Sequence, residues 1–244
     1  MERKHELTFG KDPYMKQKIY DFLAKIDYRL SPTAWSRPDY QVRLLVKELK
    51  HRHPKKVDKI LDIGGGFLAQ YKAQLLSLAG SYTNLEIAKG PLVDVVGSVY
   101  DLPFKKNTFT IVTLFMLMEH LAKPLDALKE SHRVLKKGGF LLLTTVQYWH
   151  THNYPSDYFR YTAAGLEYLL QEAGFTVVAI WSHGGPWLVL FHVIELNLPE
   201  LFRPFFSIAF YRFANVLDWV FFRHEDRREN ADSVGWSVIA QKTS

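Results

Sequence analysis

The stretch that decides the fold is Val57–Leu68, which reads VDKILDIGGGFL. Within it, the run 59–61 meets an acid, Asp62, and after Ile63 the stretch breaks into three consecutive glycines, Gly64, Gly65 and Gly66. A buried strand that ends in this way builds a nucleotide-sized pocket in open parallel sheets, because glycines let the backbone approach a ligand closely. The acid suits a ligand that carries a positive group better than one that presents a pyrophosphate.

The bulk composition is that of a folded, cysteine-free protein. The chain has 244 residues and is 48% hydrophobic, which is enough for a full core. The absence of cysteine excludes disulfides, thiolate metal sites and cysteine nucleophiles, and it is compatible with a reducing compartment. The first seventeen residues hold no apolar segment of the signal-peptide kind. We therefore expect a cytoplasmic protein.

The positive charge is concentrated at the N-terminus. The net charge is +6, and residues 1–59 carry 15 Lys and Arg against 8 Asp and Glu, whereas the rest of the chain is close to neutral. A basic arm can meet anionic lipid or nucleic acid, although a solvated helical surface is the plainer interpretation. Because no nucleic-acid recognition motif is present and the remainder is near neutral, nucleic acid is disfavoured as a partner.

Two amphipathic helices are expected before the glycine loop, as an N-terminal helical cap over residues 1–56. One starts at Asp12-Pro13 and the other at 36–38, each with an N-cap and an early proline. Apolar residues then recur at helical spacing, which predicts that each helix lies on the core. These residues are Ile19, Phe22, Leu23 and Ile26 in the first helix, and Val42, Leu45, Val46 and Leu49 in the second.

From residue 57 to residue 244, strand and helix patterns alternate, which predicts a parallel α/β domain. Between 88 and 92, a link of five residues spans at most about 17 Å, so no crossover helix is expected there. We predict strands at 57–63, 82–87, 93–97, 109–115, 140–146, 175–181 and 234–241, and helices near 67–79, 122–135 and 162–173. The helix after the glycines would favour a carboxylate at its N-terminus.

An aromatic insert, residues 186–222, interrupts the alternation. In its second half, polar residues form one helical stripe and most of the remaining circumference is apolar. Arg212 and Asp218 argue against a membrane-spanning helix. The insert is therefore interpreted as core or dimer packing or, alternatively, as a membrane-surface contact or a lid over a lipid substrate.

Two further acids extend the pocket beyond the glycine loop. Asp62 and the loop together suit the amino-acid end of S-adenosylmethionine, which carries an ammonium and a carboxylate. Glu86, at the end of the next predicted strand, can accept hydrogen bonds from both ribose hydroxyls. Asp101 can accept the exocyclic amine of adenine, while Leu102 and Phe104 in the same turn cover the ring.

In this order, these elements resemble the class I S-adenosylmethionine-dependent methyltransferases, of the small-molecule, type 11-like kind. Residues 108–120, 131–139 and 155–175 carry further marks of that family, so the resemblance covers 57–182 and the last strand. It implies a Rossmann-like seven-stranded sheet, mostly parallel, with an antiparallel last strand. Leu68 stands where the family usually has a third glycine, and Thr110 where it often has an acid.

Methyl transfer chiefly requires alignment of the acceptor with the methyl group, and a base only when the acceptor is protonated. Candidates lie in the loops at the carboxyl ends of the strands, at 115–120 and 148–160. We assign His120 as the base and Phe115 as a cofactor contact. The acceptor would be bound by Trp149, Tyr154, Tyr158 and Arg160, with cation–π support for the sulfonium from the aromatic rings.

The sequence leaves several alternatives for the site and for the function. His120, His150 and His152 suggest a metal site, but no acid joins them by spacing and methyl displacement needs no metal, so none is expected. The leading hypothesis is methylation of a small, apolar or lipid-like acceptor. An inactive methyltransferase-like domain that binds a membrane or partner is the second, and a dehydrogenase is disfavoured by Asp62. A homodimer stays open.

Overall fold

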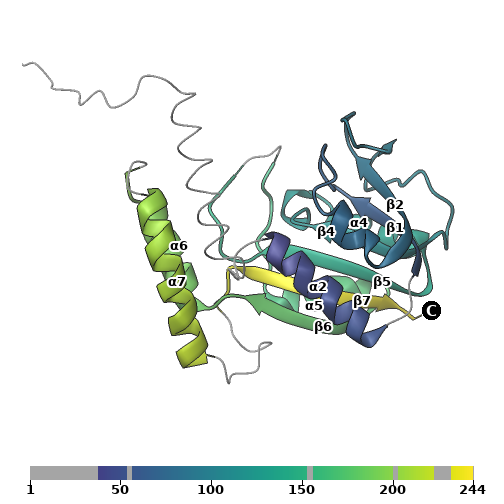
Figure 1. The fold of residues 1–244 in the computed structure, drawn as a ribbon. Coiled ribbons are helices and arrows are strands. Elements are labelled where there is room, and N and C mark those ends of the chain that lie inside the picture. The colour runs from purple at the N-terminus through teal and green to yellow at the C-terminus, as the bar shows by residue number, and fades with distance from the viewer. Residues whose placement is uncertain (1–37, 54–56, 153–155, 200–202, 223–231, 244) are drawn as a thin grey trace, which may run out of the picture.

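In the computed structural model, the described residues are 38–53, 57–152, 156–199, 203–222 and 232–243. They form one sheet with helices on both faces and a separate pair of helices at one end (Figure 1). The helix predicted from Asp12 and the acceptor residue Tyr154 lie outside these ranges. The division of the chain at residue 57 stays a prediction.

The sheet has seven strands in the order β3-β2-β1-β4-β5-β7-β6. All neighbours pair in parallel except β7, which is antiparallel to both β5 and β6. This confirms the predicted fold class. The strands are β1 (Val57–Ile63), β2 (Ala79–Glu86), β3 (Val95–Val96), β4 (Phe109–Phe115), β5 (Leu135–Val146), β6 (Phe175–His183) and β7 (Gly235–Lys242).

The helices connect most of these strands, but residues 87–94, between β2 and β3, contain none, as predicted. A 3₁₀ turn, Met118–His120, follows β4. The helices are α2 (Pro38–Arg52), α3 (Lys72–Leu76), α4 (Pro124–Val134), α5 (Ala163–Glu172), α6 (Pro186–Leu196) and α7 (Arg203–Phe222).

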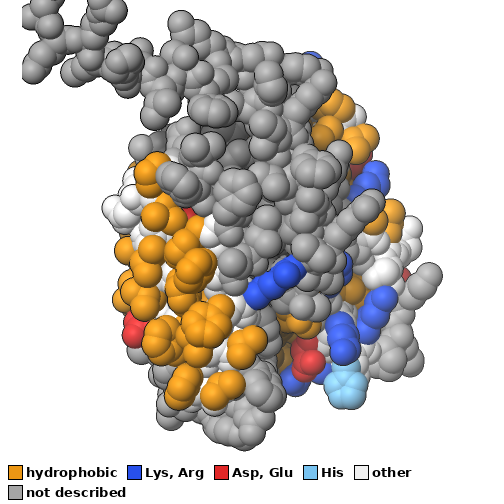
Figure 2. Space-filling view, turned by 60° about the vertical axis from the view of Figure 1, so that its left-hand side comes forward, with side chains coloured by type: hydrophobic (Ala, Val, Ile, Leu, Met, Phe, Trp, Pro, Cys, Tyr) orange, Lys and Arg blue, Asp and Glu red, His pale blue; other side chains and the backbone are white. Residues whose placement is uncertain are grey.

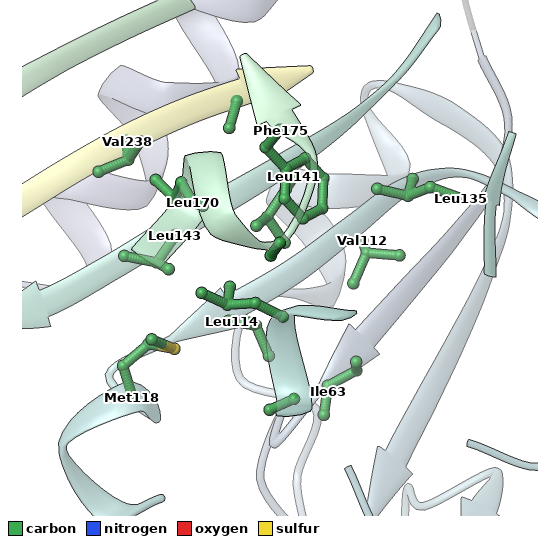
Figure 3. Packing of buried hydrophobic residues seen from close by; sticks show 14 of the residues in the cluster. Ile63, Val112, Leu114, Met118, Leu135, Leu141, Leu143, Leu170, Phe175 and Val238 are labelled. Atoms are coloured by element: carbon green, nitrogen blue, oxygen red, sulfur yellow. The ribbon is translucent and has the colours of Figure 1, made fainter. Parts of the chain in front are cut away.

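The core lies on both faces of the sheet. Along β5, Leu141 and Leu143 belong to the cluster that α4 and α5 cover, shown in Figure 3, while Phe140 and Leu142 belong to the cluster under α2 and α3. Successive side chains of a strand point to opposite faces, so a strand buried on both sides reads as a continuous apolar run. The apolar stripe predicted for the second N-terminal helix lies in α2 and is buried.

The helix predicted over 67–79 is wrong in length. Residues 67–71 form turns, and α3 has only five residues. Ala69 adopts a φ of 47°, which no right-handed helix can include. Strand β2 then begins at Ala79, three residues before its predicted start. The glycine loop therefore has no long helix behind it, and the predicted helix N-terminus for a carboxylate is absent.

The aromatic insert is a pair of helices, α6 and α7, that stands beyond the end of β6 (Figure 1). Asp218 of α7 joins the pair, because its carboxylate accepts the backbone N–H groups of Gly185 at 2.9 Å, Trp187 at 3.0 Å and Leu188 at 3.2 Å. These groups open α6 and have no partner within that helix. Of the helices described, none is both long and apolar enough to cross a bilayer.

Candidate active site

The glycine loop requires glycine for two different reasons. Gly64 and Gly66 have φ angles of +72° and +79°, which side chains rarely tolerate. Gly65 has no such angle, but a Cβ there would lie 2.5 Å from Asp62 Oδ2 and 2.7 Å from Asn84 Oδ1. A Cβ on Gly66 would meet nothing within 4 Å. The loop is thus packed tightly on the protein and open at Gly66, where a ligand can approach the backbone.

Asp62 lies beneath this loop and is fully buried. Its carboxylate accepts hydrogen bonds from the hydroxyl of Tyr82, at 2.7 Å, and from the hydroxyl of Thr113. Burial raises the pKa of Asp62 to about 6, although the two hydroxyls oppose the shift. In this structure Asp62 supports the loop from below, and its predicted contact with an ammonium stays a prediction.

Glu86 stands at the end of β2 beside the open side of the loop. Its Oε1 accepts the backbone N–H of Gly66 at 2.8 Å. Asn84, two residues earlier, is fully buried and donates to the carbonyls of Gly66 at 2.9 Å and Leu92 at 2.8 Å. Asn84 is not among the residues predicted from the sequence, although its place two residues before Glu86 puts it near the same strand end.

The turn that follows β3 is held by an ion pair from α4. Glu130 accepts the backbone N–H of Leu102 at 2.9 Å, and Arg133 donates to the carbonyls of Leu102, at 2.9 Å, and Phe104, at 2.8 Å. Asp101 is exposed, as its predicted role requires. The side chain of Leu102 is 2% exposed and packs in the core, and its predicted contact with a ligand ring stays a prediction.

Phe115, the last residue of β4 and a predicted cofactor contact, is also buried, and its predicted role stays a prediction. Its ring is 4% exposed and meets Tyr71 edge-on, with the ring centroids 5.3 Å apart, inside the core cluster under α2 and α3. The hydrophobic pattern of the strand continues to its last residue, so this side chain is buried. Beyond it, Met116 has a φ of 48°, an uncommon backbone conformation of the kind that clusters at functional sites.

The turn after β4 places Glu119 and His120 at the carboxyl edge of the sheet. Glu119 is fully buried, and its Oε2 accepts the hydroxyl of Thr145 at 2.9 Å. Burial raises its pKa, and the neighbouring imidazoles of His120 and His152 lower it. His120 is partly exposed, and its Nδ1 lies 2.6 Å from the carbonyl oxygen of Ser156. Its role as a base stays a prediction.

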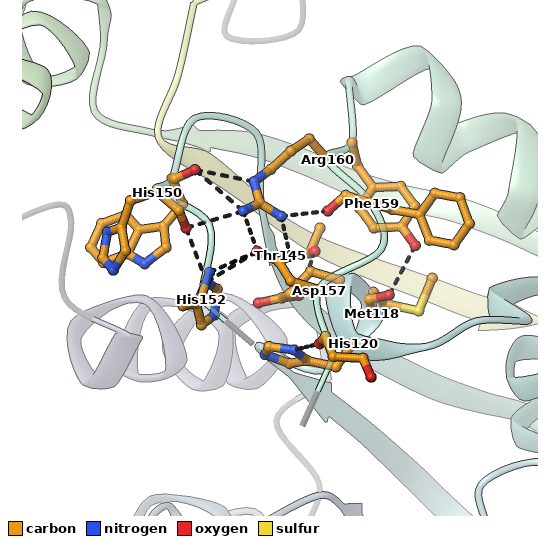
Figure 4. Close-up of polar contacts among 12 residues, drawn as sticks. Met118, His120, Thr145, His150, His152, Asp157, Phe159 and Arg160 are labelled. Atoms are coloured by element: carbon orange, nitrogen blue, oxygen red, sulfur yellow. Dashed lines mark hydrogen bonds and ion pairs between the residues drawn. The ribbon is translucent and has the colours of Figure 1, made fainter. Parts of the chain in front are cut away.

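An ion pair builds the segment that follows β5, as Figure 4 shows. The Arg160 guanidinium binds both carboxylate oxygens of Asp157 and donates to the carbonyls of Trp149 at 3.3 Å and His150 at 3.1 Å. It also holds the pKa of Asp157 well below its usual range. Asp157 in turn accepts the backbone N–H of His152 at 2.9 Å. The geometry thus makes Arg160 a support for this segment, and its predicted contact with an acceptor stays a prediction.

Trp149 connects this segment to the helix pair. Its ring stacks on that of His192 in α6, with centroids 4.3 Å apart and an interplanar angle of 15°. Tyr158 is 53% exposed and lies near Phe159, so both rings are accessible at the same edge. The structure therefore brings His120, Trp149 and Tyr158 to the carboxyl edge of the sheet, as predicted, although none of their assigned roles is tested.

The carboxyl ends of β1 and β2 present the residue types expected around a nucleoside with an amino-acid tail. The loop backbone is open at Gly66, Glu86 lies beside it, and Asp101 is exposed in the next turn. A family model described as a methyltransferase domain matches residues 61–143, which include the strand end with Asp62 and the glycine loop. Over these residues the chain is similar to the class I S-adenosylmethionine-dependent methyltransferases.

Individual relatives agree with this family. An uncharacterized methyltransferase of Schizosaccharomyces pombe is 29% identical over 147 residues, 51% of each chain. A ubiquinone/menaquinone biosynthesis C-methyltransferase, UbiE, of Rhizobium meliloti is 31% identical over 117 residues, 48% of this chain and 41% of that one. The present chain thus spans about half the length of these curated relatives.

A solved structure shows the same fold over the whole chain. The 1,6-didemethyltoxoflavin-N1-methyltransferase of Burkholderia thailandensis, with bound S-adenosylhomocysteine, covers 99% of both chains with a TM-score of 0.55 and 14% identity. In the present chain, the open loop at Gly66 with Glu86 beside it fits S-adenosylmethionine, the cofactor that the methyltransferase match implies.

Proposed function

We propose that this methyltransferase transfers the methyl group of S-adenosylmethionine to a small, apolar or lipid-like acceptor. The observation that carries the acceptor class is the outward face of α6 and α7. On it, eight large apolar side chains are 38 to 62% exposed. Figure 2 shows hydrophobic side chains gathered on this face. They are Leu190, Val193, Ile194, Phe210, Phe213, Val216, Val220 and Phe221.

Core packing does not account for this face, because the inner side of the pair is packed separately. Leu188 of α6 and Ala214 of α7 are both fully buried and belong to one apolar cluster. Trp149, from the segment after β5, packs against the same cluster. Large exposed apolar areas on a soluble fold mark sites for apolar ligands, partners or membrane surfaces. Helices α6 and α7 follow the carboxyl end of β6, at the same edge of the sheet as the candidate site.

In the proposed reaction, the acceptor attacks the methyl carbon, the carbon–sulfur bond breaks, and S-adenosylhomocysteine leaves. The glycine loop would hold the amino-acid end of the cofactor, Glu86 its ribose and Asp101 its adenine. Methyl transfer is accelerated mainly by alignment of the acceptor with the methyl group, and the loops at the carboxyl edge of the sheet would provide that alignment. For an acceptor that carries a proton, His120 is the proposed base, because its Nδ1–H can donate to Ser156 and leave Nε2 to accept.

The name of the Rhizobium meliloti relative places that protein in ubiquinone and menaquinone biosynthesis, and this supports a lipid-like acceptor for the present chain. None of the relatives supports the alternative of an inactive binding module. A cytoplasmic location, peripheral contact with a membrane and a homodimer remain proposals of the same rank.

The test has two parts. First, calorimetry with S-adenosylhomocysteine measures cofactor binding, and no binding at millimolar ligand in a folded sample would refute the function. Second, methyl-labelled S-adenosylmethionine is incubated with protein and a prenylated phenol or a bacterial lipid extract. We expect label in the organic phase. Label only in a polar product would refute the acceptor class and leave methyl transfer intact.

Vesicle flotation tests the apolar face separately. The triple variant F213S/V216S/V220S changes three half-exposed side chains of α7, so the fold is expected to survive. We expect the wild type to float with phosphatidylcholine–phosphatidylglycerol vesicles and the variant to stay at the bottom. Tyr168→Ser, at a 62% exposed position of α5, is the matched control. Equal flotation of all three proteins would contradict a membrane contact through this face.

A further inference from the structure

Three side chains that are candidates for metal ligation meet at the carboxyl edge of β4 and β5. One ligand atom from each of Glu119, His120 and His152 lies within 4.8 Å of the others. The rings of the two histidines are perpendicular, with centroids 4.9 Å apart. The sequence grouped His150 and His152 with His120, but it did not show that an acid joins them, because Glu119 is 33 residues from His152 in the chain.

In each of the three residues, one possible ligand atom takes part in a hydrogen bond within the protein, and the other is available to a metal ion. Glu119 Oε2 accepts from Thr145, whereas Oε1 is buried without a hydrogen-bond partner among the described residues. A buried carboxylate oxygen without a partner is costly, and a cation is one way to satisfy it.

The two histidines are oriented in the same manner. The Nδ1 of His120 lies 2.6 Å from the carbonyl of Ser156, and the Nδ1 of His152 lies 3.1 Å from the carbonyl of His150. An imidazole that donates its Nδ1–H to a carbonyl has an unprotonated Nε2. Metal-binding histidines are commonly oriented by such hydrogen bonds from the other ring nitrogen.

The surrounding segment also fixes His152. Asp157 accepts its backbone N–H, and Arg160 holds both Asp157 and the carbonyl of His150. Among the described residues, the hydrogen bonds of this network, drawn in Figure 4, join residues of the same segment, so the network positions that segment. A preformed support of this kind is what an exact arrangement of ligands needs.

We propose that Glu119, His120 and His152 bind a divalent transition-metal ion of the zinc class. Two imidazole nitrogens and one carboxylate are a ligand set that suits such ions and leaves at least one coordination position for an oxygen ligand. An ion about 2.1 Å from each donor would hold the donors roughly 3 to 4 Å apart, so small side-chain rotations close the site. With the ion bound, His120 is a ligand through Nε2 and no longer a base through that atom.

The test uses the full chain without a histidine tag, stripped with a chelator and titrated with zinc chloride by calorimetry. We expect one zinc ion per chain. Co²⁺ in the same protein should give the visible absorption bands of a low-symmetry site. Glu119→Gln and His152→Gln are expected to weaken zinc binding by about 100-fold, while Thr145→Val, which removes the support of Glu119, should weaken it about 10-fold.

Two histidines serve as matched controls. His150 belongs to the same segment but not to the trio, and His51 lies exposed at the end of α2. His150→Gln and His51→Gln should leave zinc binding unchanged, and circular dichroism checks the fold of each variant. The proposal is overturned if wild type binds no zinc, or if His150→Gln loses as much affinity as His152→Gln. Neither result depends on methyl transfer, so the proposed function is tested independently.

Discussion

The close packing around Gly65 predicts that Gly65→Ala lowers both the stability of the fold and the affinity for the cofactor. The added methyl carbon would lie 2.5 Å from Asp62 Oδ2 and 2.7 Å from Asn84 Oδ1. Because an ordinary carbon–oxygen contact is about 3.4 Å, the loop or the two side chains must move by roughly 0.8 Å. Both neighbours are fully buried, and the Asp62 carboxylate is held by Tyr82 and Thr113, so the loop is the part that yields.

The magnitude follows from overpacking. Extra methyl groups in packed sites typically cost about 1 to 3 kcal/mol, so we expect a loss of about 2 kcal/mol in the free energy of unfolding. A loop lifted by this amount loses about one hydrogen bond to a bound ligand. That loss is worth roughly 1.4 kcal/mol and lowers affinity about 10-fold. Urea unfolding measures the first quantity, and calorimetry with S-adenosylhomocysteine measures the second.

Two other glycines serve as comparisons. A Cβ on Gly80 would meet only the carbonyl of Asp58, at 3.7 Å, so Gly80→Ala should change neither quantity. Gly66→Ala adds no collision but places alanine at a φ of +79°, which costs about 1 to 2 kcal/mol of strain. If Gly65→Ala binds and unfolds like Gly80→Ala, the assignment of Gly65 as a sterically required glycine is refuted.

Three further predictions concern stability and support. Burial lowers the pKa of His183 to about 3, so on acidification the unfolded state takes up this proton before the folded state does. In urea unfolding, the free energy of unfolding of the wild type should therefore fall by roughly 2 kcal/mol more than that of His183→Asn between pH 7 and pH 5. Asp218→Ala removes the cap of α6, so we expect the free energy of unfolding to fall by about 1 to 2 kcal/mol and the melting temperature to fall with it. Asp232→Ala should change neither quantity. Arg133→Met should loosen the turn at Leu102 and weaken S-adenosylhomocysteine binding about 10-fold in calorimetry, with a near-native fold.

The strand pattern was predictable because it depends on local periodicity. The predicted boundaries of β1 and β4 agree with the structure, since each is an apolar run with a clear end. The missing helix between β2 and β3 followed from chain length alone. The helix after the glycine loop was not predictable in length, because Ala69 takes a positive φ that its residue type does not signal.

The candidate site was predictable only in outline. Glu86 and the glycines lie together because the carboxyl ends of neighbouring parallel strands meet at one edge. Leu102 and Phe115 were assigned to the cofactor, yet their side chains are in the core. An apolar residue at the end of an element suits a ligand or the core equally well in sequence, and only the packing around it distinguishes the two.

The sequence by itself determined the sheet-forming segments, the loop with its three glycines and the apolar character of residues 186–222. These features reside in local composition and spacing. Tertiary structure alone decided that Asp62 accepts hydrogen bonds from Tyr82 and Thr113, that Asp218 caps α6, and that Glu119 meets His152. Such contacts join residues 20 to 51 positions apart along the chain. Strand order and helix packing set them, and a hydrophobic pattern does not encode either one uniquely.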